Sequence, residues 1–216
     1  VTGFPSSPMN NLTDIPIMAR ALQLARRGRY SCMPNPHVGC VLVRDGEVIG
    51  EGHTRPAGGN HAEIEALQAA GNAQGATAYV TLEPCSHQGK TGPCADALVN
   101  AGVVRVVAAM TDPNPEVAGQ GLARLRAAGI AVECGVLENE ARALNPGFIA
   151  RMSRGRGRVR AKLAMSLDGR TAMASGESQW ITSAAARQDV QRLRAGSCAV
   201  LTGIGTVLSD NCALTV

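Results

Sequence analysis

The chain has 216 residues, of which 45% are hydrophobic and 2% aromatic, and a formal net charge of +4 at pH 7. The hydrophobic share is normal for a globular protein and excludes a wholly disordered chain, and no stretch approaches the roughly 20 consecutive apolar residues of a membrane-spanning helix. The scarcity of aromatic side chains disfavours a protein that stacks on single-stranded nucleic acid, while the mild charge suits an anionic small molecule.

The first element along the chain is predicted to be a helix. Asp14 is a candidate N-cap, Pro16 would lie in the first turn, and Gly28 would end the helix. Two strand-like segments follow, at residues 38–43 and 47–50, and the dipeptide Asp-Gly between them is typical of a tight hairpin turn. The sequence therefore predicts a helix followed by a β-hairpin.

Helices and strands alternate after the hairpin. We expect helices at residues 61–71, 94–101 and 119–128, and strands at residues 76–82, 103–109 and 130–134. Such alternation indicates a largely parallel sheet covered by helices, with the hairpin as an antiparallel edge. The predicted fold class is a three-layer α/β domain with a mixed sheet.

A basic, glycine-containing run separates this pattern from a second one. We expect residues 1–8 to be a non-native extension with Met9 as the native start, residues 9–150 to form the first domain, and residues 151–158 to be a linker. Residues 159–216 would begin a second domain, with strands at 159–165 and 199–201 and a helix at 184–193. About sixty residues with one helix are marginal for an independent core, so this second domain is expected to be truncated.

The strongest candidates for a functional site are His61, Glu63, Cys85 and Cys94. One imidazole and two thiolates can hold a zinc ion with one position left for water, which is the pattern of catalytic rather than structural zinc sites. Glu63 is then free to shuttle a proton from the water to the substrate and to the leaving group. Each residue alone has an ordinary explanation as a helix start or a buried thiol, but the ordered combination favours a hydrolytic zinc site. His-x-Glu followed by Pro-Cys and a second Cys is the pattern of zinc deaminases.

Four longer motifs make the resemblance specific. They are Pro34-Asn-Pro-His-Val-Gly39, His61-Ala-Glu63, Asp112-Pro-Asn-Pro115, and the segment from Thr81 to Cys94, which places eight residues between the two cysteines. From about Met9 to its end, the chain closely resembles the bifunctional riboflavin-biosynthesis deaminase–reductases of the cytidine-deaminase-like superfamily. The resemblance implies zinc-dependent deamination of 2,5-diamino-6-ribosylamino-4(3H)-pyrimidinone 5′-phosphate, followed by NADPH-dependent reduction of its ribosyl group.

The resemblance also implies the residues that contact substrate in the deaminase half. These are Asn35, His53, His87, Lys90, Asp112 and Asn114. Lys90 and His87 could meet a phosphate, and Asn35 could hydrogen-bond the edge of the ring. Asparagine and aspartate beside proline are also common turn residues, which is the alternative explanation for Asn35, Asp112 and Asn114.

The second half resembles the start of a dihydrofolate-reductase-like reductase domain. The resemblance places Ala164, Trp180, Thr206 and Asp210 near NADPH, and Ser178, Arg194 and Leu214 near the ribosyl phosphate substrate. Asn211-Cys212 stands where the family usually has Asp-Pro. We expect this polypeptide, as it stands, not to reduce its substrate.

Two other classes of function remain open from the residues alone. One is a nucleic-acid-editing deaminase that grips backbone phosphate through the arginines of residues 151–160, and the other is a zinc-stabilised module without catalysis. The favoured partner is a small phosphoribosylated pyrimidine, with neither nucleic acid nor membrane, in a homo-oligomer. Seven cysteines are an odd count in a chain of this length, which argues against a disulfide framework and for a cytoplasmic protein.

Overall fold

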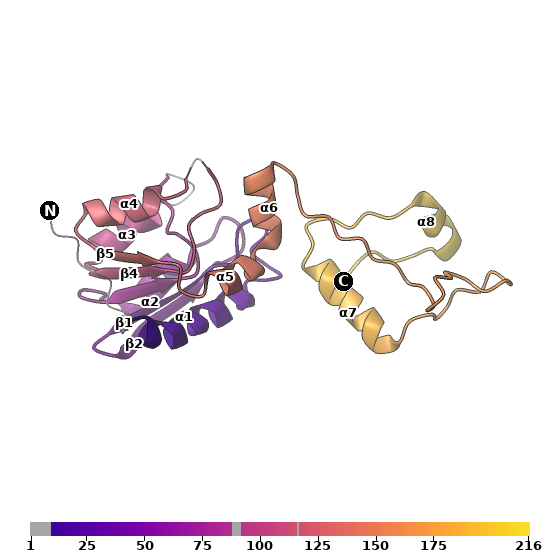
Figure 1. The fold of residues 1–216 in the computed structure, drawn as a ribbon, viewed down its shortest axis with the longest axis horizontal. Coiled ribbons are helices and arrows are strands. Elements are labelled where there is room, and N and C mark those ends of the chain that lie inside the picture. Colours follow the sequence, from indigo (N-terminus) through magenta and orange to yellow (C-terminus); the bar gives the residue numbers. More distant parts are fainter. Residues whose placement is uncertain (1–9, 88–91, 116) are drawn as a thin grey trace. The chain divides into compact units, whose positions relative to one another are not determined.

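The computed structural model describes residues 10–87, 92–115 and 117–216. The chain divides into a first unit that ends at Arg158 and a second unit, Val159–Val216 (Figure 1). The elements of the first unit, in chain order, are α1 (Asn10–Arg27), β1 (Gly39–Arg44), β2 (Glu47–His53), α2 (Ala62–Ala70), β3 (Thr77–Val80), α3 (Cys94–Asn100), β4 (Arg105–Ala108), α4 (Gln120–Ala127), β5 (Ala131–Cys134), α5 (Glu138–Leu144) and α6 (Pro146–Arg154).

The sheet of the first unit has the strand order β2-β1-β3-β4-β5. β1 is antiparallel to both β2 and β3, whereas β3, β4 and β5 run parallel to one another. The predicted mixed sheet with an antiparallel hairpin at its edge is confirmed. In a sheet of this kind, ligands bind beyond the carboxyl ends of the parallel strands, so a site is expected at the segments after β3 and β4.

Glycines in the hairpin show how closely the helices pack on both faces of the sheet. A Cβ on Gly39 would collide with the backbone of α1 at Ala21, and a Cβ on Gly52 would collide with the backbone of α2 at Ala62. Gly52 pairs with Cys40, so these two residues face the same side of the sheet. Gly39 precedes Cys40 and therefore faces the other side, so α1 and α2 cover opposite faces. α5 contacts α1, and α3 contacts both α2 and α4, which gives three layers (Figure 1).

The predicted hairpin turn is confirmed, whereas the predicted start of α1 is wrong. Asp45 and Gly46 have φ angles of 53° and 82°, as a tight hairpin turn requires, so the predicted turn is confirmed. Asp14 is not an N-cap, because α1 already includes Asn10 and takes Pro16 into its interior. The prediction for Asp14 was wrong because its side chain is buried and bonded to distant strands.

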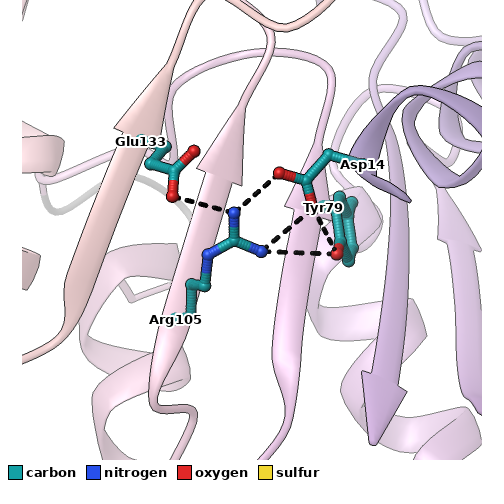
Figure 2. A network of polar contacts seen from close by, with 4 residues as sticks. All are labelled: Asp14, Tyr79, Arg105 and Glu133. Atoms are coloured by element: carbon teal, nitrogen blue, oxygen red, sulfur yellow. Dashed lines mark hydrogen bonds and ion pairs between the residues drawn. The ribbon is translucent and has the colours of Figure 1, made fainter. Parts of the chain in front are cut away.

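Asp14 belongs to a polar network that ties α1 to three neighbouring parts of the sheet (Figure 2). Its carboxylate accepts hydrogen bonds from the Tyr79 hydroxyl at 2.8 Å and from both terminal nitrogens of Arg105 at 3.0 and 2.7 Å. Arg105 also pairs with Glu133 on β5 at 2.9 Å. Burial opposes the charge on Asp14, but the hydrogen bonds from Arg105 and Tyr79 prevail and lower the pKa of Asp14 below its ordinary value. The network therefore holds a charged carboxylate inside the unit.

Asp14→Asn is expected to lower the free energy of unfolding of the first unit by about 3 kcal/mol at pH 7, because it leaves the Arg105 charge partly buried with one partner fewer. Since the pKa of Asp14 is lower in the folded than in the unfolded chain, this stabilisation is present above pH ~4 and is lost as the pH falls through the folded-state pKa. Denaturant unfolding of both proteins between pH 7 and pH 2.5 measures the difference.

The matched control for Asp14→Asn is Glu51→Gln, which removes an exposed ion pair with Arg20. An exposed pair contributes about 0–1 kcal/mol, so the control should be nearly as stable as the wild type. A difference between wild type and Asp14→Asn that stays constant down to pH 2.5 would show that the charge on Asp14 does not stabilise the fold.

The end of the first unit departs from the predicted linker. α5 and α6 follow β5, and the last turn of α6 includes Arg151 and Arg154, which the sequence predicts to lie in the linker. α6 ends where Gly155 adopts a φ of 67°. α5 was missed because its N-cap, Leu137, has a positive φ of 57° and no side-chain cap, so the usual N-terminal signal is absent. α6 begins at Asn145-Pro146, a pattern that is also common in turns.

The second unit contains helices α7 (Ala184–Ala195) and α8 (Ile204–Asp210). α7 agrees with its prediction and is capped by Ser183, whose hydroxyl accepts a hydrogen bond from the Ala186 amide at 3.2 Å. The strands predicted at residues 159–165 and 199–201 do not form, and Val159 and Leu201 are more than 90% exposed. These segments find no ladder partner within the unit, and strand propensity alone does not hold an unpaired strand. No helix among the described residues is long and apolar enough to cross a membrane.

Candidate metal centre

Three ligand-bearing side chains meet beyond the carboxyl end of β3. His61 is the N-cap of α2, Cys85 lies on the segment after β3, and Cys94 is the first residue of α3. Their ligand atoms all lie within 4.8 Å of one another. The His61 Nδ1 atom is 3.3 Å from the Cys94 Sγ atom and 3.6 Å from the Cys85 Sγ atom. The structure thus brings together all three predicted metal ligands.

The distances between these atoms fit a zinc ion. With Zn–N near 2.1 Å and Zn–S near 2.3 Å, tetrahedral angles place a nitrogen and a sulfur ligand about 3.6 Å apart. The two observed nitrogen–sulfur separations, 3.3 and 3.6 Å, agree with that value. One nitrogen and two soft sulfur donors are a donor set that zinc prefers. His61, Cys85 and Cys94 therefore fit zinc in both chemistry and spacing.

The surroundings of the two thiols favour a thiolate. Hydrogen bonds from the Cys94 thiol, from His61 and from the Cys94 backbone amide lower the pKa of Cys85 to about 4. The amide hydrogen bond is 3.3 Å long and comes from the start of α3, where the helix dipole stabilises negative charge. The hydrogen bond with Cys85 in turn raises the pKa of Cys94. The two sulfurs therefore share a proton that a bound cation would displace.

Glu63 lies in the first turn of α2, two residues after His61, and its side chain is buried. Burial and the nearby charge on Cys85 raise the pKa of Glu63 to about 7. The carboxyl group also interacts with Cys94, so it faces the metal ligands rather than solvent. A carboxyl group that titrates near neutral pH in such a position can both accept and donate a proton.

Asp112 and His87 lie near the metal ligands. Asp112 follows β4, and burial raises the pKa of its carboxyl group, which senses the charges of Glu83, His87 and Cys85. The Asp112 carboxylate also accepts a hydrogen bond from the Asn114 amide at 2.8 Å, which shapes the segment that holds both residues. His87 is exposed, and Lys90 lies outside the described residues.

Asn35 and His53 lie on two segments that are bonded to each other. Thr54, next to His53, exchanges hydrogen bonds with Val38: the Thr54 amide donates to the Val38 carbonyl at 3.0 Å, and the Val38 amide donates to the Thr54 hydroxyl at 3.1 Å. Both Asn35 and His53 are half-buried. Within the part of the chain that the structure describes, no hydrogen bond joins either side chain to the metal ligands.

Asn145, between α5 and α6, was not predicted from the sequence but holds the Asn35 segment in place. Its side-chain oxygen accepts a hydrogen bond from the His37 amide at 2.7 Å, and its side-chain nitrogen donates to the His37 carbonyl at 2.9 Å. The His37 ring lies 3.2 Å from the Leu144 carbonyl. The only signal in the sequence is an asparagine before a proline, which is an ordinary turn pattern.

Asn145→Ala is expected to lower the free energy of unfolding by about 2 kcal/mol, because the His37 amide and carbonyl both lose their partner. Hydrogen exchange at the His37 amide should accelerate at least tenfold. Ser153→Ala is the control, since it removes an exposed side-chain hydrogen bond within α6. An unchanged exchange rate at His37 would contradict a clamping role for Asn145.

In the second unit the predicted reductase residues do not form a closed site. Thr206, Asp210, Ser178 and Trp180 are exposed, while Ala164, Arg194 and Leu214 are half-buried. Trp180 packs against Arg187, whose guanidinium carbon lies 4.2 Å from the ring centre. An open pocket of about 550 Å³ is lined by Ser166, Arg170, Ala172, Met173, Ala174 and Ile181, none of which is a predicted contact residue.

Comparison with known proteins assigns both units. A family model of the cytidine and deoxycytidylate deaminase zinc-binding region matches residues 12–110, and a model of the RibD C-terminal domain matches residues 158–216. The riboflavin biosynthesis protein RibD of Escherichia coli is 64% identical over 92% of this chain and 54% of its own length. The chain therefore spans about half the length of the curated relatives it matches.

Two solved structures are similar in both sequence and fold. Acinetobacter baumannii RibD (form 2) is 58% identical with a TM-score of 0.91, over 95% of this chain and 58% of that one. A diaminohydroxyphosphoribosylaminopyrimidine deaminase/5-amino-6-(5-phosphoribosylamino)uracil reductase from Thermotoga maritima is 43% identical with a TM-score of 0.88, over 94% of this chain and 59% of that one. The α/β fold expected from the sequence is confirmed.

Proposed function

Because this chain belongs to the family of bifunctional riboflavin-biosynthesis deaminase–reductases, we propose that its first unit deaminates 2,5-diamino-6-ribosylamino-4(3H)-pyrimidinone 5′-phosphate with the help of zinc. The reaction replaces an exocyclic amine by an oxygen from water and releases ammonia. The observation that supports it most is the buried Glu63 carboxyl group beside three clustered metal-ligand atoms.

The resident metal in this proposal is zinc, held by His61, Cys85 and Cys94. When bound, zinc acts as a Lewis acid that makes water a nucleophile near neutral pH. The three residues supply two negative charges and one neutral ligand, which balance a divalent cation. This donor set leaves no fourth protein ligand in the cluster found among the described residues, in agreement with a catalytic rather than a structural site.

Glu63 moves the protons of the reaction. It accepts a proton from the attacking water and delivers it to a ring nitrogen of the substrate. It then takes the second proton from the hydroxyl group added to the ring carbon and passes it to the departing amine, which leaves as ammonia while the C=O bond forms. Its burial excludes bulk water as a competing proton donor. The pKa of about 7 supports both directions of transfer at neutral pH.

The substrate contacts are proposed from the family. The charges of Cys85 and His87 both act on the Asp112 carboxyl group, which supports a place for Asp112 near the metal ligands. Asn35, His53, Lys90 and Asn114 complete the proposed set. His87 is exposed and lies three residues before Lys90, and both side chains can donate hydrogen bonds to the 5′-phosphate. The Asp112 carboxylate can accept hydrogen bonds from donor groups of the ring.

The second unit is proposed to contribute to the NADPH-dependent reduction of 5-amino-6-(5-phosphoribosylamino)uracil in the complete protein. Ala164, Trp180, Thr206 and Asp210 would face NADPH, and Ser178, Arg194 and Leu214 would face the substrate. We also propose a cytoplasmic homo-oligomer, in which a reducing setting keeps the thiols of Cys85 and Cys94 available for zinc.

Ammonia release tests the proposed deaminase directly. The zinc-loaded chain is incubated with the diaminopyrimidine ribotide, cytidine, guanine or an RNA oligonucleotide, and zinc is measured in the same samples. We expect sustained release from the ribotide alone. Faster release from RNA, with an affinity that falls steeply with salt, would indicate a nucleic-acid deaminase instead. No release from any substrate by zinc-loaded protein would refute the proposed function.

A further inference from the structure

Glu83 is a buried carboxylate that the proposed mechanism does not use. Its side chain is only 3% exposed and lies two residues before Cys85. It accepts four backbone hydrogen bonds: Oε2 from the amides of Asp112 and Gly119, both at 2.9 Å, and Oε1 from the amides of Gly121 and Leu122, at 2.8 and 3.2 Å. Both carboxylate oxygens are therefore fully engaged.

The four donors belong to two segments that must meet near the metal centre. Asp112 begins the segment after β4 that holds the proposed substrate contacts, and the other three amides belong to the start of α4. A negative charge at the start of a helix is stabilised by its unpaired amides and its dipole. Glu83 thus joins the segment before Cys85, the Asp112 segment and α4 at one point.

Close packing around Glu83 restricts movement of the three segments that it connects. A Cβ on Gly121 would collide with the Pro84 carbonyl and would lie 3.2 Å from the Glu83 side chain. α4 also contacts the sequence neighbours of both cysteines: Arg124 donates to the carbonyl of Ser86, which follows Cys85, at 3.2 Å and pairs with Asp96, two residues after Cys94. α4 is therefore fixed against both cysteine segments.

We propose that Glu83 is a positioning residue that sets the Asp112 segment at its working distance from the metal ligands. The inference rests on the proposed deaminase function, because the contact between Asp112 and substrate is part of that proposal. A carboxylate is needed since it offers two acceptor atoms. A glutamine of the same shape offers one, and its amide group would face two backbone amides that also donate. Glu83 itself contacts neither metal nor substrate.

The first test is Glu83→Gln in the zinc-loaded full chain. We expect KM for the ribotide to rise about tenfold or more, because small misplacements of substrate contacts have large effects, with one zinc still bound per chain. Hydrogen exchange at Asp112 and Gly119 should accelerate. Tyr79→Phe is the stability control: it weakens the fold through the Asp14 network, which includes none of the metal ligands or proposed substrate contacts, and should leave KM unchanged. An unchanged KM in Glu83→Gln would overturn the proposal.

A second measurement needs no variant, in case Glu83→Gln does not fold. In the wild-type chain, the amides of Asp112 and Gly119 should exchange as slowly as amides inside α4, although neither lies within a helix or strand. Exchange as fast as at the exposed hairpin turn would overturn the proposal. Both exchange measurements are independent of turnover, so they separate a failure of this inference from a failure of the deaminase assignment.

Discussion

Glu63→Gln is expected to reduce ammonia release from the ribotide about a thousandfold while one zinc ion per chain remains bound. The amide keeps the size and the burial of the side chain but cannot accept a proton from water at neutral pH. General acid–base groups contribute roughly 10²- to 10⁴-fold to rate. Because Glu63 serves both proton transfers in the proposed reaction, the loss should exceed the lower limit of this range and appear in kcat.

Turnover, zinc content and thermal unfolding of the same preparations measure this effect. Glu65→Gln is the matched control, because it makes the same chemical change on the same helix at a carboxylate that pairs with Arg55 and Asn60 instead of facing the metal ligands. The control should keep kcat within about twofold. Equal turnover in wild type and Glu63→Gln would rule out the proton shuttle and leave a zinc module without the proposed chemistry.

The metal centre could be predicted from the sequence because its signal is local. His61 caps a helix whose end is marked by Gly71, and Cys94 begins the next helix after a recognisable strand. Alternation of strands and helices then brings their ends to one edge of the sheet. The hairpin could also be predicted from the sequence, since aspartate and glycine tolerate the positive φ angles that Asp45 and Gly46 adopt in the turn.

The buried polar contacts of Glu83, Asn145 and Asp14 could not be predicted from the sequence, because their partners are far away along the chain and are mostly backbone groups. Glu83 binds amides 29 to 39 positions away, and Asn145 binds the backbone of His37 across 108 positions. A backbone amide has no signature in the sequence. Asp14 was misread for a related reason, since an acidic residue near a helix start is usually a cap, and only the tertiary structure reveals its partners Tyr79 and Arg105.

The second unit shows the limit of strand propensity. Residues 159–165 have a strand-like pattern, yet Val159 and Leu163 are exposed and unpaired in the described unit. A helix such as α7 satisfies its own backbone and was predicted correctly, whereas a strand depends on a neighbour. Of the two helices of this unit, the sequence predicted α7 but not α8, and neither predicted strand forms.

Cys85→Ser is expected to weaken zinc affinity by at least about a hundredfold and to reduce ammonia release to background. A serine hydroxyl is a harder and far less acidic donor than the thiol of Cys85, whose pKa is lowered to about 4 by its neighbours. Removing zinc from the wild type with a chelator should have the same effect on turnover, and adding zinc back should restore it. Zinc competition with a chromophoric chelator measures the affinity.

Cys134→Ser separates the loss of a ligand from the loss of any thiol. Cys134 is an exposed cysteine at the end of β5, outside the cluster of metal-ligand atoms, so its variant should bind zinc and turn over substrate like the wild type. If Cys85→Ser bound zinc as tightly as Cys134→Ser, then His61, Cys85 and Cys94 would not be the ligand set. Glu63 can move protons but cannot by itself make water a sufficient nucleophile at neutral pH, so we expect no turnover in metal-free wild type. Retained turnover there would exclude zinc from the chemistry.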